Sequence, residues 1–138
     1  MPKPKKIIIM VDMTCSILHH GHIRILKKAS KFGEVIVALT SDEEILKHKK
    51  FKTLLNFTQR KEILLAVKYV SKVIKSQYLI TDSFIKASKC DYLIHGSDSQ
   101  DKANLKNLKI IKRTKNISST ALRNFNKLTI RKIKEYFN

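Results

Sequence analysis

Short apolar runs alternate with amphipathic stretches along most of this chain. Runs rich in β-branched residues are typical of buried strands, and apolar residues spaced three and four apart are typical of helices. The apolar runs predict strands at 6–11, 35–39, 70–74, 92–95 and 108–112. The helical spacing predicts a helix that stops at Gly33, one that begins at Ser41 or Asp42, and helices at 58–69, 82–88, 118–125 and 129–136, with Thr58 and Asp82 as caps. Because strands and helices alternate, we predict one α/β domain over 1–138, with a Rossmann-like open parallel sheet of five strands and helices on both faces.

Polar clusters follow three of the predicted strands. His19-His20-Gly21-His22 lies after the first strand, at the start of a helix, and His95-Gly96-Ser97-Asp98 lies after the fourth. The segments Arg113-Thr114 and Ile117–Thr120 follow the fifth. The carboxyl ends of parallel strands meet at one edge of a sheet, where ligands bind. Helix N-termini attract anions, a glycine permits close approach to the backbone, and imidazole can donate to phosphate. These segments therefore predict a site that handles phosphate.

The composition gives a strongly basic chain of 138 residues with a formal net charge of +18. This charge predicts an anionic partner. The excess is mostly lysine spread along helices, without an Arg-rich arm or an aromatic RNA-binding motif, so we expect no nucleic-acid partner. No apolar run approaches the roughly 18 residues of a membrane span, and the run after the basic N-terminus is too short for a signal peptide. We therefore expect a cytoplasmic protein without stable membrane association.

Two cysteines and five histidines raise two alternatives. A zinc site is disfavoured because the spacing of His19, His20 and His22 is not a usual ligand spacing and no second pair completes a tetrahedral set. A nucleophilic Cys15 is disfavoured because no orienting Asn or Asp is evident, so we expect a packed thiol. Cys90 is far from Cys15 in sequence, and both are expected to be free thiols. No metal site made by the protein alone is expected.

Several motifs together resemble a known family. His19–His22 is similar to the HxGH signature of the nucleotidyltransferase superfamily, and RTKNISST at 113–120 is similar to the RTxGISTT signature of its cytidylyltransferases of the glycerol-3-phosphate and phosphocholine type. The segments KHKK at 47–50, TQRKEIL at 58–64 and GSD at 96–98 fall in the matching order. The resemblance implies that the phosphate of a small acceptor attacks the α-phosphorus of CTP, with Mg²⁺ assisting and pyrophosphate leaving. It also implies a homodimer.

The resemblance assigns roles to individual residues. It implies catalytic roles for His19, His22, Lys49 and Arg113. Arg60 would anchor the acceptor phosphate or the loop around it. Substrate binding would involve Thr14, Gly21, Lys47, Arg60, Asp98, Thr114, Ile117, Ser118, Ser119 and Thr120.

The chain departs from the family pattern just before the histidines. The GTFD segment of the family reads Met13-Thr14-Cys15-Ser16 here, so that Ser16 stands in place of an aspartate. Asp12 is a nearby carboxylate that could compensate. The glycine of RTxGIS is Asn116, and the tryptophan of GDDW is Ser99.

Three functions follow from these observations. The leading hypothesis is a cytidylyltransferase, with glycerol 3-phosphate as the default acceptor and other phosphorylated compounds open. The second is an adenylyltransferase of the same fold. The third is a non-catalytic binder of anions or nucleic acid, which the charge and the missing aspartate motivate.

Overall fold

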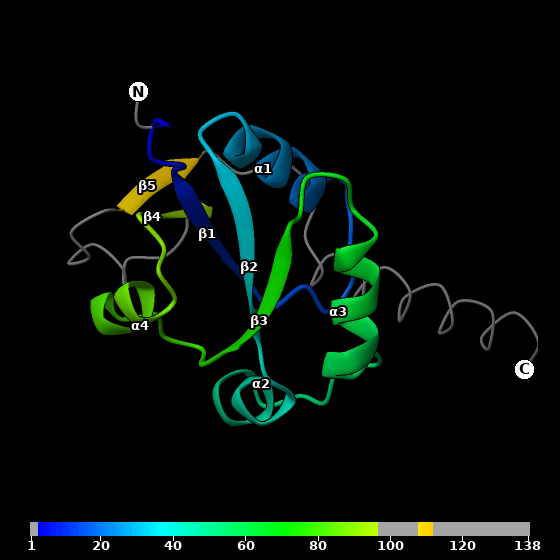
Figure 1. Cartoon of the computed structure of the whole chain (residues 1–138). Coiled ribbons are helices and arrows are strands. Elements are labelled where there is room, and N and C mark those ends of the chain that lie inside the picture. The colour runs from blue at the N-terminus through cyan, green and yellow to red at the C-terminus, as the bar shows by residue number, and fades with distance from the viewer. Residues whose placement is uncertain (1–2, 97–107, 112–138) are drawn as a thin grey trace, which may run out of the picture.

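A computed structural model describes residues 3–96 and 108–111 of the chain. Its strands are β1 (Ile8–Met13), β2 (Glu34–Thr40), β3 (Lys72–Ser76), β4 (Tyr92–Gly96) and β5 (Leu108–Ile111). They pair in parallel in the order β3-β2-β1-β4-β5. The strands β1, β2 and β3 run toward the bottom of Figure 1. The predicted parallel α/β fold is confirmed.

The strand order places β1 in the middle of the sheet. From β1 the chain passes outward to β2 and β3 on one side, and then returns to β4 and β5 on the other side. The order therefore reverses between β1 and β4. In open parallel sheets, ligands bind outside the carboxyl ends of the strands at such a switch point.

The helices are α1 (His20–Ser30), α2 (Asp42–Lys49), α3 (Phe57–Leu65) and α4 (Asp82–Ala87). Ser41 caps α2, as one of the two predicted alternatives. The predicted caps Thr58 and Asp82 are wrong. Asn56 caps α3 through a reciprocal pair of bonds with Gln59, which satisfies two amide groups at once. Thr81 caps α4 because its hydroxyl accepts from the Phe84 amide.

The third predicted helix is also too long, since α3 ends at Leu65 rather than at residue 69. The residues that follow, including Val67, Tyr69 and Val70, pack back onto the core beside the sheet. The next strand consequently starts at Lys72 instead of residue 70. The helices predicted at 118–125 and 129–136 lie outside the described residues.

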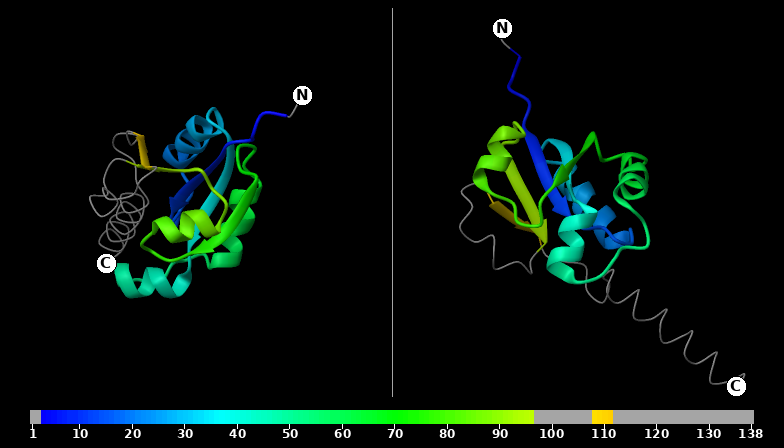
Figure 2. Two further views of the ribbon diagram at one scale, coloured as in Figure 1. Left: turned by 60° about the vertical axis from the view of Figure 1, so that its left-hand side comes forward. Right: turned by 90° about the horizontal axis from the view of Figure 1, so that it is seen from below.

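Successive side chains of each strand point to opposite faces of the sheet, and they pack into two core clusters, one on each face. The first cluster joins Ile9, Val11, Val37 and Leu39 to α1 and α3 through Leu26, Ala29 and Leu64. The second cluster joins Met10, Ile36, Ala38 and Leu93 to Ile80, Ile85 and Cys90 around α4. Helices therefore flank the sheet, with α1 and α3 against one face and α4 against the other (Figure 2).

Candidate active site at the carboxyl edge of the sheet

The segment between β1 and α1 turns sharply at Cys15. Its φ of 48° lies in the left-handed region, which costs a residue with a Cβ of the order of 1 kcal/mol. The surrounding structure holds this conformation because the Cys15 side chain is part of the first core cluster. Burial raises the pKa of the Cys15 thiol to about 12, and the nearby Arg60 charge opposes this only in part. The thiol therefore stays protonated near neutral pH, as expected of a packed cysteine.

His19 and His22 begin α1 as a reciprocal capping pair. The Gly21 amide donates to His19 Nδ1 at 3.1 Å, and the His19 amide donates to His22 Nδ1 at 3.2 Å. The two rings lie with their centroids 3.9 Å apart. An Nδ1 that accepts a hydrogen bond carries no proton, so each neutral ring holds its proton on Nε2. Both imidazoles can therefore donate from Nε2 without being charged.

The N-terminus of α1 also suits an anion. Its first turn reads His-Gly-His-Ile and contains no carboxylate. By contrast, the first turn of α2 carries Asp42, Glu43 and Glu44, whose charges oppose the binding of an anion there. Gly21 is buried, and its amide serves the cap. The positive end of the α1 dipole and the two Nε2–H groups therefore lie at the same end of one helix.

Arg60 is buried on α3, with only 1% of its side chain exposed. Its guanidinium donates to the backbone carbonyls of Leu55, Thr14 and Thr40 and to Asp42 Oδ1 at 2.7 Å. Four of its five N–H groups are thus engaged by the protein itself. These contacts fit the predicted role in anchoring the loop after β1, because Thr14 belongs to that loop. They give no support to direct contact with an acceptor phosphate.

Asp42 links the same group of elements from the other side. Its Oδ2 accepts from the Phe57 amide at 3.0 Å, and its Oδ1 accepts from Arg60. Burial tends to raise the pKa of Asp42, but the hydrogen bonds from Phe57 and Arg60 and the nearby cations outweigh it, so the pKa lies below its ordinary value. The carboxylate is therefore charged when it holds α2, α3 and the loop after β1 together.

Lys47 and Lys49 lie near the end of α2 and are exposed. Because α2 continues directly from the carboxyl end of β2, both lysines belong to the same edge of the sheet as the histidines. Glu44 of α2 accepts from the Tyr78 amide at 3.1 Å, and this bond attaches the helix to the segment after β3. Within α2, Glu44 also lies 3.1 Å from His48 Nε2. The His48 and Tyr78 rings also stack, with centroids 4.7 Å apart.

Asp12 and His95, whose contact with each other was not predicted, bridge the strands at the switch point. Asp12 Oδ1 lies 2.7 Å from His95 Nδ1. The two side chains are mostly buried, with 9% of Asp12 and 21% of His95 exposed. The sequence offered a signal, since each residue stands at the carboxyl end of an otherwise apolar strand. Their contact was not evident, because 83 residues separate them.

The sequence profile of the cytidylyltransferase-like family matches residues 14–125. The chain belongs to this family. The glycerol-3-phosphate cytidylyltransferase of Staphylococcus aureus is 32% identical over 117 residues, which cover 80% of this chain and 87% of that protein. The ethanolamine-phosphate cytidylyltransferase of Dictyostelium discoideum is 29% identical over 130 residues, or 86% of this chain.

The chain spans only part of some relatives, and it is also similar to proteins of other names. The matches to three ethanolamine-phosphate cytidylyltransferases span 24–36% of the length of those proteins. FAD synthases are also similar, among them that of Thermococcus sibiricus, at 29% identity over 125 residues, 89% of this chain and 83% of that protein. The crystal structure of a lipopolysaccharide core biosynthesis protein from Thermoplasma volcanium shares the fold, with a TM-score of 0.65 and 22% identity over 82% of this chain and all of that one.

Seven residues of the predicted site lie outside the part of the chain that the structure describes. They are Asp98, Arg113, Thr114, Ile117, Ser118, Ser119 and Thr120. The profile match runs through all of them, since it extends to residue 125. Their assignment stays a prediction.

Within residues 3–96 and 108–111, no group of three or more His, Cys, Asp or Glu side chains could hold a metal ion. Mg²⁺ in nucleotide sites takes most of its ligands from phosphate and water, with one or two carboxylates from the protein. Asp12 is a carboxylate at the carboxyl edge that suits this limited role. In the same described part, no helix is long and apolar enough to cross a membrane.

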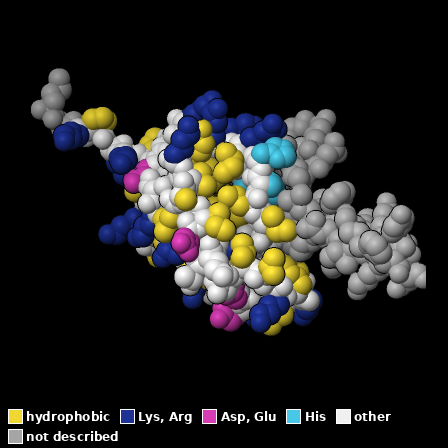
Figure 3. All heavy atoms as spheres, turned by 90° about the vertical axis from the view of Figure 1, so that its right-hand side faces the viewer, with side chains coloured by type: hydrophobic (Ala, Val, Ile, Leu, Met, Phe, Trp, Pro, Cys, Tyr) yellow, Lys and Arg dark blue, Asp and Glu magenta, His cyan; other side chains and the backbone are white. Residues whose placement is uncertain are grey.

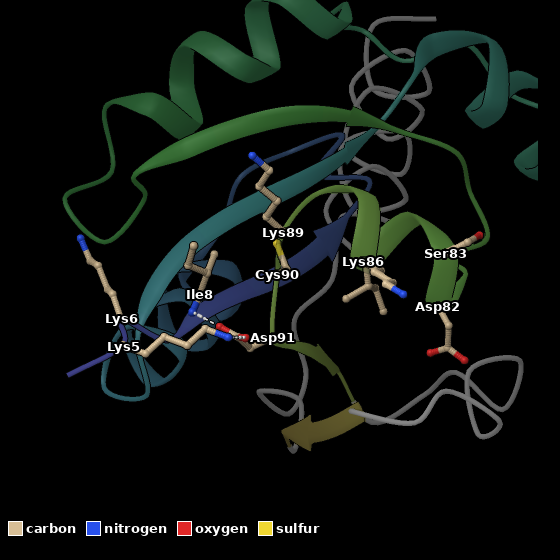
Figure 4. A pocket seen from close by; sticks show the side chains of 10 residues that line it. Lys5, Lys6, Ile8, Asp82, Ser83, Lys86, Lys89, Cys90 and Asp91 are labelled. Atoms are coloured by element: carbon tan, nitrogen blue, oxygen red, sulfur yellow. Dashed lines mark hydrogen bonds and ion pairs between the residues drawn. The ribbon is translucent and has the colours of Figure 1, made fainter. Parts of the chain in front are cut away.

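The cytidylyltransferase-like chain also has a cavity of about 680 Å³ around the amino ends of β1 and β4. Lys5, Lys86, Cys90 and Asp91 are among the residues that line it (Figure 4). Asp91 accepts from the Ile8 amide at 2.9 Å and from Lys5 at 3.4 Å. The Ile8 bond and the Lys5 charge hold the pKa of this carboxyl below its usual range. The cavity faces the edge opposite the histidines, so it is not part of the candidate active site.

Proposed function

We propose that this chain transfers CMP from CTP to a small phosphorylated acceptor and releases pyrophosphate. Membership of the cytidylyltransferase-like family supports the reaction class. The observation that carries the proposal is the capping pair of His19 and His22, because it supplies two neutral donors at the positive end of a helix. Such preorganised donors stabilise charge that develops in a transition state.

In this reaction an oxygen of the acceptor phosphate attacks the α-phosphorus of CTP. A new P–O bond forms, the bond from the α-phosphorus to the bridging oxygen breaks, and pyrophosphate takes that electron pair. The Nε2–H groups of His19 and His22 donate to the phosphoryl oxygens that gain charge. Lys47 and Lys49, on α2, attract the phosphates of the substrates by their positive charge. Asp12 would help to hold an Mg²⁺ ion that is bound with the nucleotide, and the ion would supply charge that neutralises part of the phosphates.

The relatives suggest which acceptors to test first. Their names specify glycerol 3-phosphate in one case and ethanolamine phosphate in the other. Glycerol 3-phosphate stays our first choice, because the match to the glycerol-3-phosphate cytidylyltransferase covers most of the length of that protein.

A second candidate function has a specific observation in its favour. FAD synthases are among the similar proteins. FAD contains an adenosine moiety, so a chain with that activity would use ATP rather than CTP. The capping pair suits transfer from either nucleotide, because in the proposed mechanism His19 and His22 contact only the phosphates and not the base.

Pyrophosphate release with CTP, ATP, GTP or UTP, each paired with a panel of acceptors, distinguishes these functions. The panel contains glycerol 3-phosphate, ethanolamine phosphate, phosphocholine and FMN. Release with CTP and a phosphorylated alcohol supports the first proposal, and release with ATP and FMN supports the second. A folded protein that releases pyrophosphate with none of the pairs contradicts both, and tight binding of DNA or RNA at physiological salt would then favour a non-catalytic binder.

The matched control for this assay is the exposed neighbour His20, which lies between the two capping residues in sequence. His20→Ala removes an imidazole from the same segment while leaving both capping bonds in place. We expect its turnover to stay within about twofold of the unmodified chain, as is usual for a surface substitution.

We also propose that the chain forms a homodimer through the side that carries α3. Figure 3 shows a stripe of hydrophobic side chains over that side. The exposed apolar residues Leu54, Ile63 and Leu65 lie on or just before α3. Sedimentation equilibrium at micromolar concentration tests this association.

A further inference from the structure

The amino ends of the parallel strands meet at the edge of the sheet opposite the candidate active site. Backbone hydrogen bonds of 2.8–2.9 Å join the segments there, from the amides of Glu34, Asp91 and Ser71 to the carbonyls of Ile7, Ile8 and Val35, respectively. The segments 3–7, 27–34, 68–72 and 86–91 therefore lie side by side. We call them together the basic edge.

Lysines gather on the basic edge. Its four segments contain ten lysines, and all ten are exposed. Figure 3 shows basic side chains along the top of the molecule, which is this edge of the sheet. The same segments contain two carboxylates, Glu34 and Asp91, which lie 3.4 Å from Lys6 and Lys5, respectively. Within the described part of the chain, the other eight lysines of the basic edge make no ion pair.

These charges lie too far from the candidate active site to attract its substrates. The six residues of β1 separate the two edges by about 20 Å. At physiological ionic strength, charges are largely screened beyond about 8 Å. The carboxyl edge itself carries several carboxylates, namely Asp12, Asp42, Glu43 and Glu44. The proposed transfer therefore does not explain the lysines at the amino edge.

Stability does not explain the basic edge either. Lys27, Lys28 and Lys86 lie in the last turns of α1 and α4, where a cation stabilises a helix. Lys68 and Lys72 lie beyond the end of α3, outside any helix. Like charges that crowd one side of a protein repel one another and destabilise the compact state. An anionic partner would remove this repulsion.

Two exposed apolar residues lie among the lysines. Ile7 is 43% exposed and Phe32 is 50% exposed. Their segments are in close contact, because a Cβ at Gly33 would lie 2.3 Å from the Ile7 carbonyl oxygen. Lysines are attracted to anionic headgroups, and apolar side chains gain free energy by entering the boundary between headgroups and acyl chains. The combination therefore suits the surface of a membrane.

A nucleic acid suits the basic edge less well. Arginine is the preferred residue for recognising phosphate, because its fork binds two oxygens at once. The described part of the chain contains two arginines, Arg24 on α1 and the buried Arg60 on α3, and both lie outside the basic edge. A duplex also offers no apolar layer to Ile7 and Phe32.

We propose that the basic edge binds the surface of an anionic lipid bilayer. Its lysines contact the phosphates of the headgroups, and Ile7 and Phe32 enter the boundary with the acyl chains. The attachment is reversible, because only a few apolar side chains take part. The carboxyl edge, with His19 and His22, then faces the water in which phosphorylated substrates dissolve. This inference goes beyond the proposed transfer and does not depend on it.

Sedimentation of the full chain with lipid vesicles measures this binding. Vesicles that contain phosphatidylglycerol should carry the protein down, and vesicles of phosphatidylcholine alone should not. The bound fraction should fall as salt is added, because salt screens the attraction between the lysines and the headgroups. Equal binding to both kinds of vesicle would contradict the role of the lysines.

A triple variant locates the binding surface. Lys27→Gln, Lys28→Gln and Lys31→Gln, made together, remove three charges beside Phe32. They should weaken binding to phosphatidylglycerol vesicles roughly hundredfold, or about fivefold for each lysine. Thermal unfolding checks that the variant is folded at the temperature of the assay, because two of these lysines lie in the last turn of α1.

The matched control removes the same charge elsewhere. Lys50→Gln, Lys52→Gln and Lys61→Gln lie after α2 and on α3, outside the basic edge. Made together, they should weaken binding to the same vesicles less than about fivefold, because they lower the net charge without removing a contact.

A tryptophan probe reports entry into the bilayer, since the chain contains no tryptophan of its own. With phosphatidylglycerol vesicles, the emission of Phe32→Trp should shift to shorter wavelength, and lipids brominated on their acyl chains should quench it. Leu79→Trp is the matched control, because Leu79 is 47% exposed and follows the carboxyl end of β3. Its emission should change in neither way.

Four results would overturn the proposal. The first is a folded chain that does not bind phosphatidylglycerol vesicles. The second is an equal loss of binding in both triple variants, which would show that net charge alone attracts the chain. The third is an equal response of Phe32→Trp and Leu79→Trp. The fourth is tight binding of DNA or RNA that the Lys27, Lys28 and Lys31 variant loses, without binding to vesicles, which would assign the basic edge to nucleic acid.

The outcomes also separate this inference from the proposed transfer. Without vesicles, pyrophosphate release by the Lys27, Lys28 and Lys31 variant should stay within about twofold of the unmodified chain, as is usual for surface substitutions. A chain that binds vesicles as expected but releases no pyrophosphate would retain the membrane surface and lose the transferase proposal. A chain that releases pyrophosphate but binds no vesicles would do the reverse.

Discussion

His19 and His22 combine two roles that substitution can separate. Each side chain caps α1 through Nδ1 and, in the proposed mechanism, donates to the substrate through Nε2. Alanine removes both roles. His19→Asn and His22→Gln remove the ring Nε2–H and keep an oxygen that can accept the same backbone amide, because Asn is a preferred N-cap and Gln is a preferred third residue of a capping box.

The two roles differ in magnitude and in the quantity that reports them. Loss of one capping bond costs about 1 kcal/mol of stability. For a chain of this size that lowers Tm by roughly 3–5 °C. Loss of one donor to the transition state lowers kcat by roughly a hundredfold to a thousandfold. We therefore expect His19→Ala and His22→Ala to lower both Tm and kcat. His19→Asn and His22→Gln should lower kcat by the same factor and leave Tm nearly unchanged.

Thermal unfolding and pyrophosphate release, measured on the four variants and the unmodified chain, check this expectation. All kcat values are taken at least 15 °C below the lowest Tm, so that the folded fraction is not limiting. The reasoning is refuted if His19→Asn and His22→Gln turn over at the rate of the unmodified chain. In that case the histidines serve only to begin the helix.

Three further predictions concern the Arg60 clamp, the turn before β2 and the thiol of Cys15. Arg60→Lys should destabilise the chain by about 3 kcal/mol or more in urea unfolding, because a point-like ammonium cannot replace the forked donor that serves Thr14 and three other acceptors; a loss below 1 kcal/mol would contradict the buried clamp. Gly33→Ala should cost about 1–3 kcal/mol, since its Cβ would lie 2.3 Å from the Ile7 carbonyl oxygen; an unchanged urea midpoint would show that the strand start can move. Cys15, with a thiol pKa of about 12, should react with a disulfide reagent at pH 8 only after unfolding, and Cys15→Ala should keep its kcat within about twofold. Rapid labelling of the folded chain at Cys15 would contradict the burial.

The sequence pattern predicted the parallel α/β fold because its signals are local. Apolar runs of four to six residues between helical stretches specify strand and helix whatever surrounds them. The position of His19–His22 after β1 likewise required only the order of elements along the chain. The resemblance to cytidylyltransferases, now supported by the family match, rested on short motifs of the same local kind.

The boundaries of α3 depended on competition that the pattern alone does not reveal. Thr58 and Asn56 are both good caps, and Asn56 prevails because Gln59 returns a second bond. The helix stops at Leu65, and the apolar residues after it pack against the core outside the helix. Both outcomes depend on contacts rather than on propensity.

Only the tertiary structure decided what Arg60, Asp12 and His95 do. An arginine on a helix next to polar residues resembles a phosphate ligand in sequence, yet its burial among backbone carbonyls makes it a clamp. Asp12 and His95 stand 83 residues apart, and they meet because β4 returns to pair with β1. Hydrophobic periodicity encodes which residues form strands, whereas the neighbours of a strand follow from the free energy of packing the whole sheet. The order of strands and helices could therefore be predicted from the sequence, but the pairing of residues across the sheet could not.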